Sequence, residues 1–375
     1  MFHYWSNGTD QDHVFSFQLT WLMSESVQGA ADPNELLRTC KDIRAGNRED
    51  WYAAFSKLGE QLEDIASQAD TKGFEATASD HFYRAFTAFR SAERVLAGTD
   101  PRKLASYRRA MRCWRRGMAL SVHPHEHVEV LLDGHRLDGW FFAPRHRIKR
   151  EPAPCIVFLS GADALPEENF FRGVQYVTAR GAACFVFNGP GQGSALREHG
   201  LVTRFDYEKP VSAAVDALMQ RSDFDHSRLG LLGVSMAGYY APRAAAYDER
   251  FKALCAWGGL HNVGSDLYDY YPPIREQLRW IGGCADDEEA RRKYAAFDLD
   301  GVAENIRCPV LITHGELDRM VPLSSARRTF DALTVADKEL RIYSQQEGGA
   351  EHCSMDNWGQ VVPYQVDWLI EKLSR

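Results

Sequence analysis

The sequence contains no apolar run long enough to cross a membrane. A spanning helix needs about 18 or more consecutive apolar residues, and the 375 residues include no such stretch. The first two dozen residues, with Asp10, Asp12 and His13, lack both the basic start and the continuous apolar core of a secretory signal peptide. We therefore expect neither a membrane-spanning segment nor a membrane partner.

Close pairs of cysteines are also missing. The eight cysteines are scattered singly, without the spacing of a zinc ribbon or a redox motif, and several lie inside apolar runs. This pattern favours reduced, mostly buried thiols in a cytoplasmic protein.

Positive charge is not in excess. The chain has 44 basic and 52 acidic residues, a formal net charge of −8, which argues against non-specific nucleic-acid binding. With 45% hydrophobic and 26% charged residues, the composition is that of an ordinary globular protein. The length suggests two or three domains, and we expect the partner to be a small molecule rather than nucleic acid.

Residues 1–120 predict a helical, lid-like N-terminal domain. Between residues 51 and 120, apolar side chains recur at three- and four-residue steps, which places them on one face of a helix. Asp100 as a cap and Pro101 at the first helical position start a further helix that runs to about Arg116. The apolar face could form a homodimer contact.

This further helix is strongly basic. Two interpretations are open: a binding surface for an anionic substrate or carrier, or a solvated helix face, which we favour. The basic residues are Arg102, Lys103, Arg108, Arg109, Arg112, Arg115 and Arg116.

Residues 121–375 predict an α/β domain. Its first part alternates with period two around a turn at Asp133 and Gly134, which predicts a hairpin. Short apolar runs then alternate with amphipathic stretches, which predicts a mostly parallel sheet covered by helices on both faces. The interval between residues 258 and 305 is too long for one crossover, so we expect an inserted helical cap at about 260–303. The runs lie at 155–159, 183–187, 229–232, 253–257, 310–313 and 340–343.

Two patterns suggest a bound group, and in both cases the simpler interpretation is favoured. His123, His125 and His127 alternate and would point the same way on a strand, but nothing nearby supplies a fourth metal ligand. The glycine-rich stretch NGPGQGS at 188–194 departs from the G-x-G-x-x-G dinucleotide fingerprint at Ser194, so we expect a structural turn. We expect neither a metal nor an organic cofactor.

The strongest motif follows the run at 229–232. Ligands of open α/β sheets bind at the carboxyl ends of the strands, and at this end the sequence is GVSMAG. It is close to the G-x-S-x-G pattern of a nucleophile elbow, in which a sharp turn from strand to helix exposes the serine. Ala237 takes the place of the second glycine. The motif predicts Ser235 as a nucleophile.

A serine nucleophile needs a base and an acid that orients the base. In this fold the acid and then the histidine follow the serine along the chain. Asp318 and His352 each follow a predicted strand, so we expect both at the same sheet edge as Ser235. His314 and Glu316 are competitors, but both precede the loop position. We predict a triad of Ser235, His352 and Asp318.

The charge that develops on an attacked carbonyl oxygen needs an oxyanion hole. One predicted donor is the backbone N–H of Met236, the residue after the nucleophile. The other comes from the loop after the run at 155–159, where Gly161 permits a tight turn and Ala162 is the predicted donor.

With these residues placed, the sequence resembles the α/β-hydrolase superfamily. Within it, the sequence is similar to a group that includes bacterial 2,6-dihydropseudooxynicotine hydrolase and the fungal yellowish-green pigment hydrolases that shorten polyketides. The similarity covers nearly all of the chain beyond residue 50, including the segments DHFYRAFTAFRSAERVL, LDGHRLDGWFFAP and NGPGQGSALREHGLVTRFDYEKPVSAAVDAL. Members usually have Asp where this chain has Asn188, a departure in a turn outside the triad.

The resemblance implies hydrolysis of a carbon–carbon bond next to a carbonyl, as in a 1,3-diketone or polyketide-like substrate, through an acyl-enzyme. The residues alone leave alternatives open. These are a carboxylesterase, an acyltransferase or cyclase, and, least favoured, a non-catalytic binding protein with an unused triad. A carbanion leaving group must be stabilised as an enolate and protonated, so carbon–carbon cleavage calls for an additional donor near the site.

The predicted cap supplies candidates for this donor and for an aromatic pocket. Asp266, Tyr268 and Asp269 in the cap, and Trp257 just before it, are the predicted substrate-binding residues. The alternative for each of them is an ordinary place in the core or on the solvated surface. An aromatic or polyketide-like substrate would suit this composition.

Overall fold

The computed structural model describes residues 10–146 and 152–374. The chain divides into two compact units, Met1–Pro124 and His125–Arg375. The helices of the first unit are α1 (Asp10–Ser26), α2 (Pro33–Cys40), α3 (Arg48–Thr71), α4 (Glu75–Arg94) and α5 (Pro101–Ala119).

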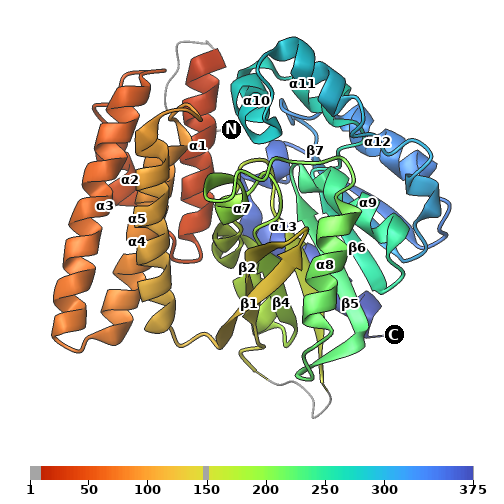
Figure 1. The fold of residues 1–375 in the computed structure, drawn as a ribbon, viewed down its shortest axis with the longest axis horizontal. Coiled ribbons are helices and arrows are strands. Elements are labelled where there is room, and N and C mark those ends of the chain that lie inside the picture. Colours follow the sequence, from red (N-terminus) through yellow and green to blue (C-terminus); the bar gives the residue numbers. More distant parts are fainter. Residues whose placement is uncertain (1–9, 147–151, 375) are drawn as a thin grey trace. The chain divides into compact units, whose positions relative to one another are not determined.

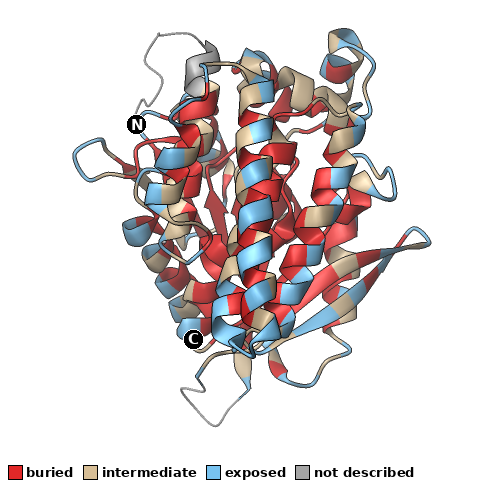
Figure 2. Ribbon diagram, turned by 90° about the vertical axis from the view of Figure 1, so that its left-hand side faces the viewer, coloured by how far each residue is buried: buried red, intermediate tan, exposed pale blue. Residues whose placement is uncertain are grey.

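The first unit is stabilised by the apolar faces of its helices. Phe15 on α1 packs edge-on against Trp51 of α3, with ring centroids 4.8 Å apart, and Trp51 stacks on Phe55. Figure 2 shows the resulting bands of buried and exposed ribbon along the helices. The start of α5 is as predicted, because the Asp100 side chain accepts a hydrogen bond from the Arg102 N–H at 2.8 Å and Pro101 occupies the first turn.

The second unit is built on a sheet of eight strands in the order β1-β2-β4-β3-β5-β6-β7-β8. The first two strands and the β2–β4 pair are antiparallel, and all other pairs are parallel. The predicted hairpin and mostly parallel sheet are therefore confirmed. The strands are β1 (His125–Leu132), β2 (His135–Phe142), β3 (Ala153–Leu159), β4 (Ala183–Phe187), β5 (Phe224–Val234), β6 (Phe251–Trp257), β7 (Val310–Gly315) and β8 (Lys338–Tyr343).

Helices cover both faces of this sheet. Helices α8 and α9 pack against each other, and α13 packs against α6 and against β5 and β6. In Figure 1, α8 and α9 lie in front of the strands and α13 lies behind them. A π-helical turn, Phe170–Val174, precedes α6. The helices are α6 (Gln175–Ala179), α7 (Gly193–Arg197), α8 (Glu208–Leu218), α9 (Ala237–Tyr247), α10 (Arg275–Gly282), α11 (Asp287–Tyr294), α12 (Leu323–Ala332) and α13 (Trp358–Leu373).

The long interval between β6 and β7 is helical, as predicted for a cap. It contains α10 and α11 together with short helical turns at Gly264–Asp269, Pro272–Ile274 and Ala303–Asn305. One expectation on the hairpin is wrong. His123 precedes β1, so the three alternating histidines do not share a strand, and His127 instead lies 2.7 Å from an oxygen of Asp138.

All eight cysteines are among the described residues, and all are free thiols. Only Cys284 is partly exposed. Within the described ranges, no helix combines the length and the apolar character that crossing a bilayer requires.

Candidate active site

Ser235 occupies the sharp turn between β5 and α9. Its φ of 60° is in the left-handed region, which non-glycine residues rarely adopt and which is enriched at functional sites. The turn is fixed on both sides, because the Ser235 N–H donates to the Trp257 carbonyl at 2.8 Å and the Ser235 carbonyl accepts from the Gly238 N–H at 2.6 Å. The serine side chain is thereby presented at the carboxyl end of the sheet.

The small residues around Ser235 are required by close packing. A Cβ added at Gly233 would lie 2.2 Å from the Ala237 carbonyl oxygen, and one added at Gly238 would lie 2.3 Å from the Gly258 carbonyl oxygen. Neither position can hold a side chain without displacing backbone. Alanine is accommodated at position 237, where α9 begins.

The structure brings Ser235, His352 and Asp318 together although they are far apart in the sequence. Ser235 Oγ lies 2.9 Å from His352 Nε2, and His352 Nδ1 lies 2.7 Å from Asp318 Oδ2. The second oxygen of Asp318 accepts the N–H groups of Met320 and Val321 at 2.8 and 2.9 Å. These bonds hold the carboxylate so that it orients the imidazole toward the serine.

The charges of the pair favour an ionised carboxylate beside the imidazole. Burial opposes the charge on Asp318, but His352 and the backbone N–H of Val321 outweigh it and lower the pKa of the carboxyl. Burial also opposes protonation of His352. The Asp318 carboxylate outweighs this effect and raises the pKa of the imidazole well above its ordinary value. An imidazole with a raised pKa is a stronger base for the serine proton.

The competing residues have other partners. His314 lies on β7, and its Nε2 donates to the Val321 carbonyl at 3.0 Å. Burial lowers the pKa of His314, so its neutral form supports the turn that holds Asp318. Glu316 is exposed and accepts the Gln345 N–H at 3.2 Å.

The loop that bears His352 is ordered by a residue that the sequence analysis missed. The Asp356 carboxylate accepts three successive N–H groups, those of Gly349, Ala350 and Glu351, at 2.8 to 3.1 Å. The carbonyl of Ala350 in turn accepts the Leu317 N–H at 2.8 Å. The loops of the candidate acid and base are thus connected directly. An acidic residue four positions after the histidine is the only sequence signal of this role.

Cys353 was also not singled out from the sequence. Its φ is 51°, and its buried thiol lies 3.3 Å from His352 Nε2, the nitrogen that faces Ser235. The thiol therefore borders the proton-transfer position.

The loop after β3 lies against the serine. A Cβ added at Gly161 would be 2.9 Å from Ser235 Cβ and 3.3 Å from its Oγ, so only glycine fits there. The predicted oxyanion donors are the backbone N–H groups of Ala162 and Met236, the residues that directly follow Gly161 and Ser235. Within the described ranges, the backbone N–H groups of Ala162 and Met236 have no acceptor. Buried or half-buried N–H groups normally have partners, and both groups are therefore available to an oxygen placed beside Ser235.

The predicted substrate-binding residues have structural partners. Tyr268 is buried and donates to Asp287 at 2.8 Å, while Asp269 is exposed and pairs with Arg291 at 2.9 Å. Trp257 is fully buried with its ring edge-on to Trp358. These partners lie within the cap or in the core of the second unit.

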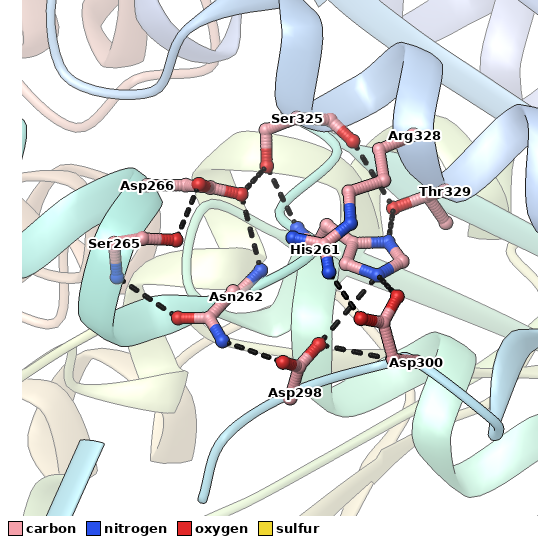
Figure 3. A network of polar contacts seen from close by, with 9 residues as sticks. All are labelled: His261, Asn262, Ser265, Asp266, Asp298, Asp300, Ser325, Arg328 and Thr329. Carbon is pink, nitrogen blue, oxygen red and sulfur yellow. Dashed lines mark hydrogen bonds and ion pairs between the residues drawn. The ribbon is translucent and has the colours of Figure 1, made fainter. Parts of the chain in front are cut away.

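Asp266 belongs to a polar network at the base of the cap. Its carboxylate accepts the Ser325 hydroxyl of α12 at 2.6 Å (Figure 3). In the same network His261 lies between Asp300, at 2.9 Å, and Thr329, at 3.1 Å. Asp300 also pairs with Arg328, so both ends of the cap are tied to α12.

Comparison with known proteins finds relatives that match this chain over most of their own length. "Hydrolase LUC6" of Fusarium sp is 29% identical over 95% of this chain and 96% of that protein. The 20-hydroxy-prefusarin hydrolase FUS2 of Gibberella moniliformis is 28% identical, covering 95% of each chain. The 2,6-dihydropseudooxynicotine hydrolase of Paenarthrobacter nicotinovorans is 27% identical over 86% of this chain and 84% of that protein.

A solved structure and a family match agree with these relatives. The crystal structure of the 2,6-dihydroxy-pseudo-oxynicotine hydrolase superimposes with a TM-score of 0.81 at 25% identity, covering 94% of this chain and 95% of that one. The predicted α/β-hydrolase fold is confirmed, and the protein is a hydrolase. Residues 168–374, more than half of the chain, match the prolyl oligopeptidase family. The chain belongs to this family of α/β hydrolases.

Proposed function

We propose that this hydrolase is serine-dependent and cleaves a carbon–carbon bond next to a carbonyl through an acyl-enzyme. The main support is the continuous hydrogen-bonded path from Ser235 Oγ through His352 to Asp318, at the end of β5 and beside Gly161. Carbon–carbon cleavage, rather than ester cleavage, is inferred from the resemblance to hydrolases of 1,3-diketones and polyketides.

In the first step Ser235 Oγ attacks a substrate carbonyl carbon, and His352 Nε2 accepts the hydroxyl proton. The new imidazolium is stabilised by Asp318, and the negative oxygen is stabilised by the N–H groups of Met236 and Ala162. Collapse of the tetrahedral adduct breaks the carbon–carbon bond, and its electron pair leaves as an enolate. The imidazolium returns its proton to the enolate carbon, which releases a ketone and leaves the acyl group on Ser235.

The second step removes the acyl group. His352 takes a proton from water, and the hydroxide attacks the ester carbonyl. The tetrahedral adduct then expels Ser235 Oγ, which recovers its proton from His352. The products are a ketone and a carboxylic acid, and no external oxidant, reductant or metal takes part in these steps.

Replacement of the nucleophile is the direct test. Ser235→Ala should lower turnover of 1,3-diketones by about 10⁴-fold or more, because the acyl-enzyme can no longer form. A fluorophosphonate probe should add its mass to the wild-type protein at Ser235 and leave Ser235→Ala unmodified. Ser227→Ala is the matched control, because Ser227 is an exposed serine of the same strand whose hydroxyl bonds Asp225.

The products decide the kind of bond that is cut. A panel of 1,3-diketones and matched esters, analysed by mass spectrometry, should yield acid and ketone from the diketones at the higher kcat/KM. Faster turnover of the esters would favour a carboxylesterase. Transfer of the acyl group to an added alcohol or amine would favour a transferase. Equal turnover by the wild type and Ser235→Ala would contradict the serine mechanism altogether.

A further inference from the structure

The glycine-rich segment at 188–194 has a buried polar side chain that the proposed reaction does not use. Gln192 lies just before α7 and is only 3% exposed. Two glycines bring it into this position. Gly191 and Gly193 have φ angles of 83° and 41°, and a Cβ at Gly193 would lie 1.4 Å from Asn188 Oδ1. The segment therefore cannot accept larger residues at these positions without moving Gln192.

The Gln192 amide is bonded at both ends. Its Nε2 donates to the carbonyl oxygens of Ser160 and Gly161, at 2.5 and 2.9 Å. Its Oε1 accepts the Tyr207 hydroxyl at 3.1 Å. Burial, and to a smaller extent the neighbouring Tyr240, raise the pKa of Tyr207 well above its ordinary value, so the hydroxyl stays protonated and donates. The carbonyls of Ser160 and Gly161 can only accept, so they fix the end of the amide that faces them as the NH₂ group.

One of the two carbonyls, that of Gly161, belongs to the peptide unit that presents the Ala162 N–H, a candidate oxyanion donor. A trans peptide is planar, and its N–H points away from its C=O. A bond to the Gly161 carbonyl therefore fixes the direction of the Ala162 N–H on the opposite side of the same peptide plane. In the same way, the bond to the Ser160 carbonyl fixes the direction of the Gly161 N–H.

We infer that Gln192 is a positioning residue that aims the backbone N–H groups of the loop after β3 at the oxyanion. This inference rests on the proposed function, since it assigns a role relative to Ser235. The segment that resembles a dinucleotide-binding loop is thus a support for the oxyanion hole.

The far end of the loop has separate supports. Asp163, with a φ of 53°, forms a buried ion pair with Arg197 of α7. Gln277 of α10 donates to Asp163 Oδ2 at 3.2 Å and, more weakly, to the Ala162 carbonyl at 3.5 Å. These contacts hold the loop after the donor. The carbonyl of the peptide that contains the Ala162 N–H is that of Gly161, which accepts the Gln192 amide at 2.9 Å and, at the longer distance of 3.4 Å, the Ala164 N–H.

The test replaces Gln192 by Met, which keeps the length but has no N–H donors, and by Glu, which places acceptor oxygens against two carbonyls. Loss of an oxyanion donor costs about 10²–10³ in kcat. We expect Gln192→Met to lower kcat on p-nitrophenyl acetate by about 10–10²-fold and Gln192→Glu by more. KM should change by less than about threefold, because ground-state binding uses the oxyanion donors less.

Two further readouts and a control variant separate positioning from a merely structural role. The pH profile of kcat should keep its shape, since His352 and Asp318 are unchanged. The affinity for a phenyl trifluoromethyl ketone, which forms a tetrahedral oxyanion, should fall in parallel with kcat/KM. Tyr207→Phe keeps the Gln192 donors and is the matched control, with an expected loss of about threefold or less.

Crystal structures of the variants test the inference independently of activity. The peptide between residues 161 and 162 should be rotated in Gln192→Met relative to the wild type. An unmoved peptide, or a kcat within twofold of the wild-type value, would overturn the inference and leave the proposed function intact. A wild-type protein that the fluorophosphonate does not label would instead refute the proposed function, while the rotation would still decide how Gln192 acts on the loop.

Discussion

In the N-terminal unit, the basic residues Arg102, Arg109 and Arg116 of α5 each pair with acidic residues of α3. In the second unit, the buried His352 has a carboxylate on one nitrogen and a neutral hydroxyl on the other. The first arrangement pairs each charge with an opposite charge. In the second arrangement His352 Nε2 can still accept a proton, because its partner is the uncharged hydroxyl of Ser235.

This comparison distinguishes ion pairs that stabilise a fold from polar groups that can take part in catalysis. Ion pairs between two helices are complete without any ligand. At the end of the sheet, by contrast, the Ala162 and Met236 N–H groups have no acceptor among the described residues, and Ser235 adopts a strained conformation. Such unsatisfied groups tend to occur where a substrate completes the set. The basic face of α5, which could have been an anion site, is therefore better explained as part of the α3–α5 contact.

The largest effect is expected from the charge that orients the base. Asp318→Asn should lower kcat by about 10⁴-fold, because the amide can stabilise the wrong tautomer of His352. The acid limb of the pH profile should also move. Activity needs neutral His352 and is lost as the pH falls through its pKa, which Asp318 raises. Without the carboxylate this pKa falls, so the limb moves to lower pH.

The control for this variant is Asp367→Asn, because Asp367 is an exposed acid that pairs only at the surface with Arg180. Its rate and pH profile should match those of the wild type. An Asp318→Asn protein that keeps more than a tenth of the wild-type kcat would show that another acid orients the imidazole.

Breaking a buried ion pair in the N-terminal unit should lower the stability of the protein and leave its activity unchanged. Glu25 and Arg90 form an ion pair with side chains only 0% and 2% exposed. Removing one member of a buried pair costs about 3–5 kcal/mol, because it leaves the other charge uncompensated. Glu25→Ala should lower the free energy of unfolding by this amount, measured with urea, while kcat per folded molecule stays unchanged.

The double variant Glu25→Ala/Arg90→Leu sharpens this test. Removing both charges should recover part of the lost stability, because no buried charge is left without a partner. If the double variant were less stable than Glu25→Ala, packing of the Arg90 side chain rather than its charge would dominate.

The sheet could be predicted from the sequence because parallel strands buried on both faces are continuous apolar runs. The run at 183–187 is β4 (Ala183–Phe187), and the run at 310–313 lies within β7 (Val310–Gly315). The predicted strand at 229–232 was shorter than the observed strand β5. Strand β5 begins at Phe224 and passes through polar residues such as Ser227, which have no apolar signal. The helices α1 and α2 lie in the predicted helical domain of residues 1–120, but no individual helix was placed before residue 51, because the resemblance to known proteins is poor there.

The candidate triad could be named because each member follows a predicted strand, and strand ends of a parallel sheet meet at one edge. The supporting residues could not. Gln192 binds backbone groups of another loop, and Asp356 binds backbone groups five to seven residues earlier in its own loop. Such contacts depend on how the loops fold over the sheet. The segment of Gln192 even suggested a different role, since its glycines resemble a phosphate-binding turn. The cap residues Tyr268 and Asp269 have partners within the cap, and their predicted contacts with substrate remain predictions.

The smallest effect is expected on the basic face of α5. Arg109 pairs with Glu60 and Glu63 and lies over the Phe89 ring, with its guanidinium carbon 4.3 Å from the centroid. Partly exposed pairs of this kind contribute about 1 kcal/mol or less. Arg109→Ala should therefore change the free energy of unfolding only slightly. For both anionic and neutral substrates, its KM should equal that of the wild type. A tenfold rise in KM confined to anionic substrates would instead make this helix face a binding surface, and the contrast between the two units would no longer hold.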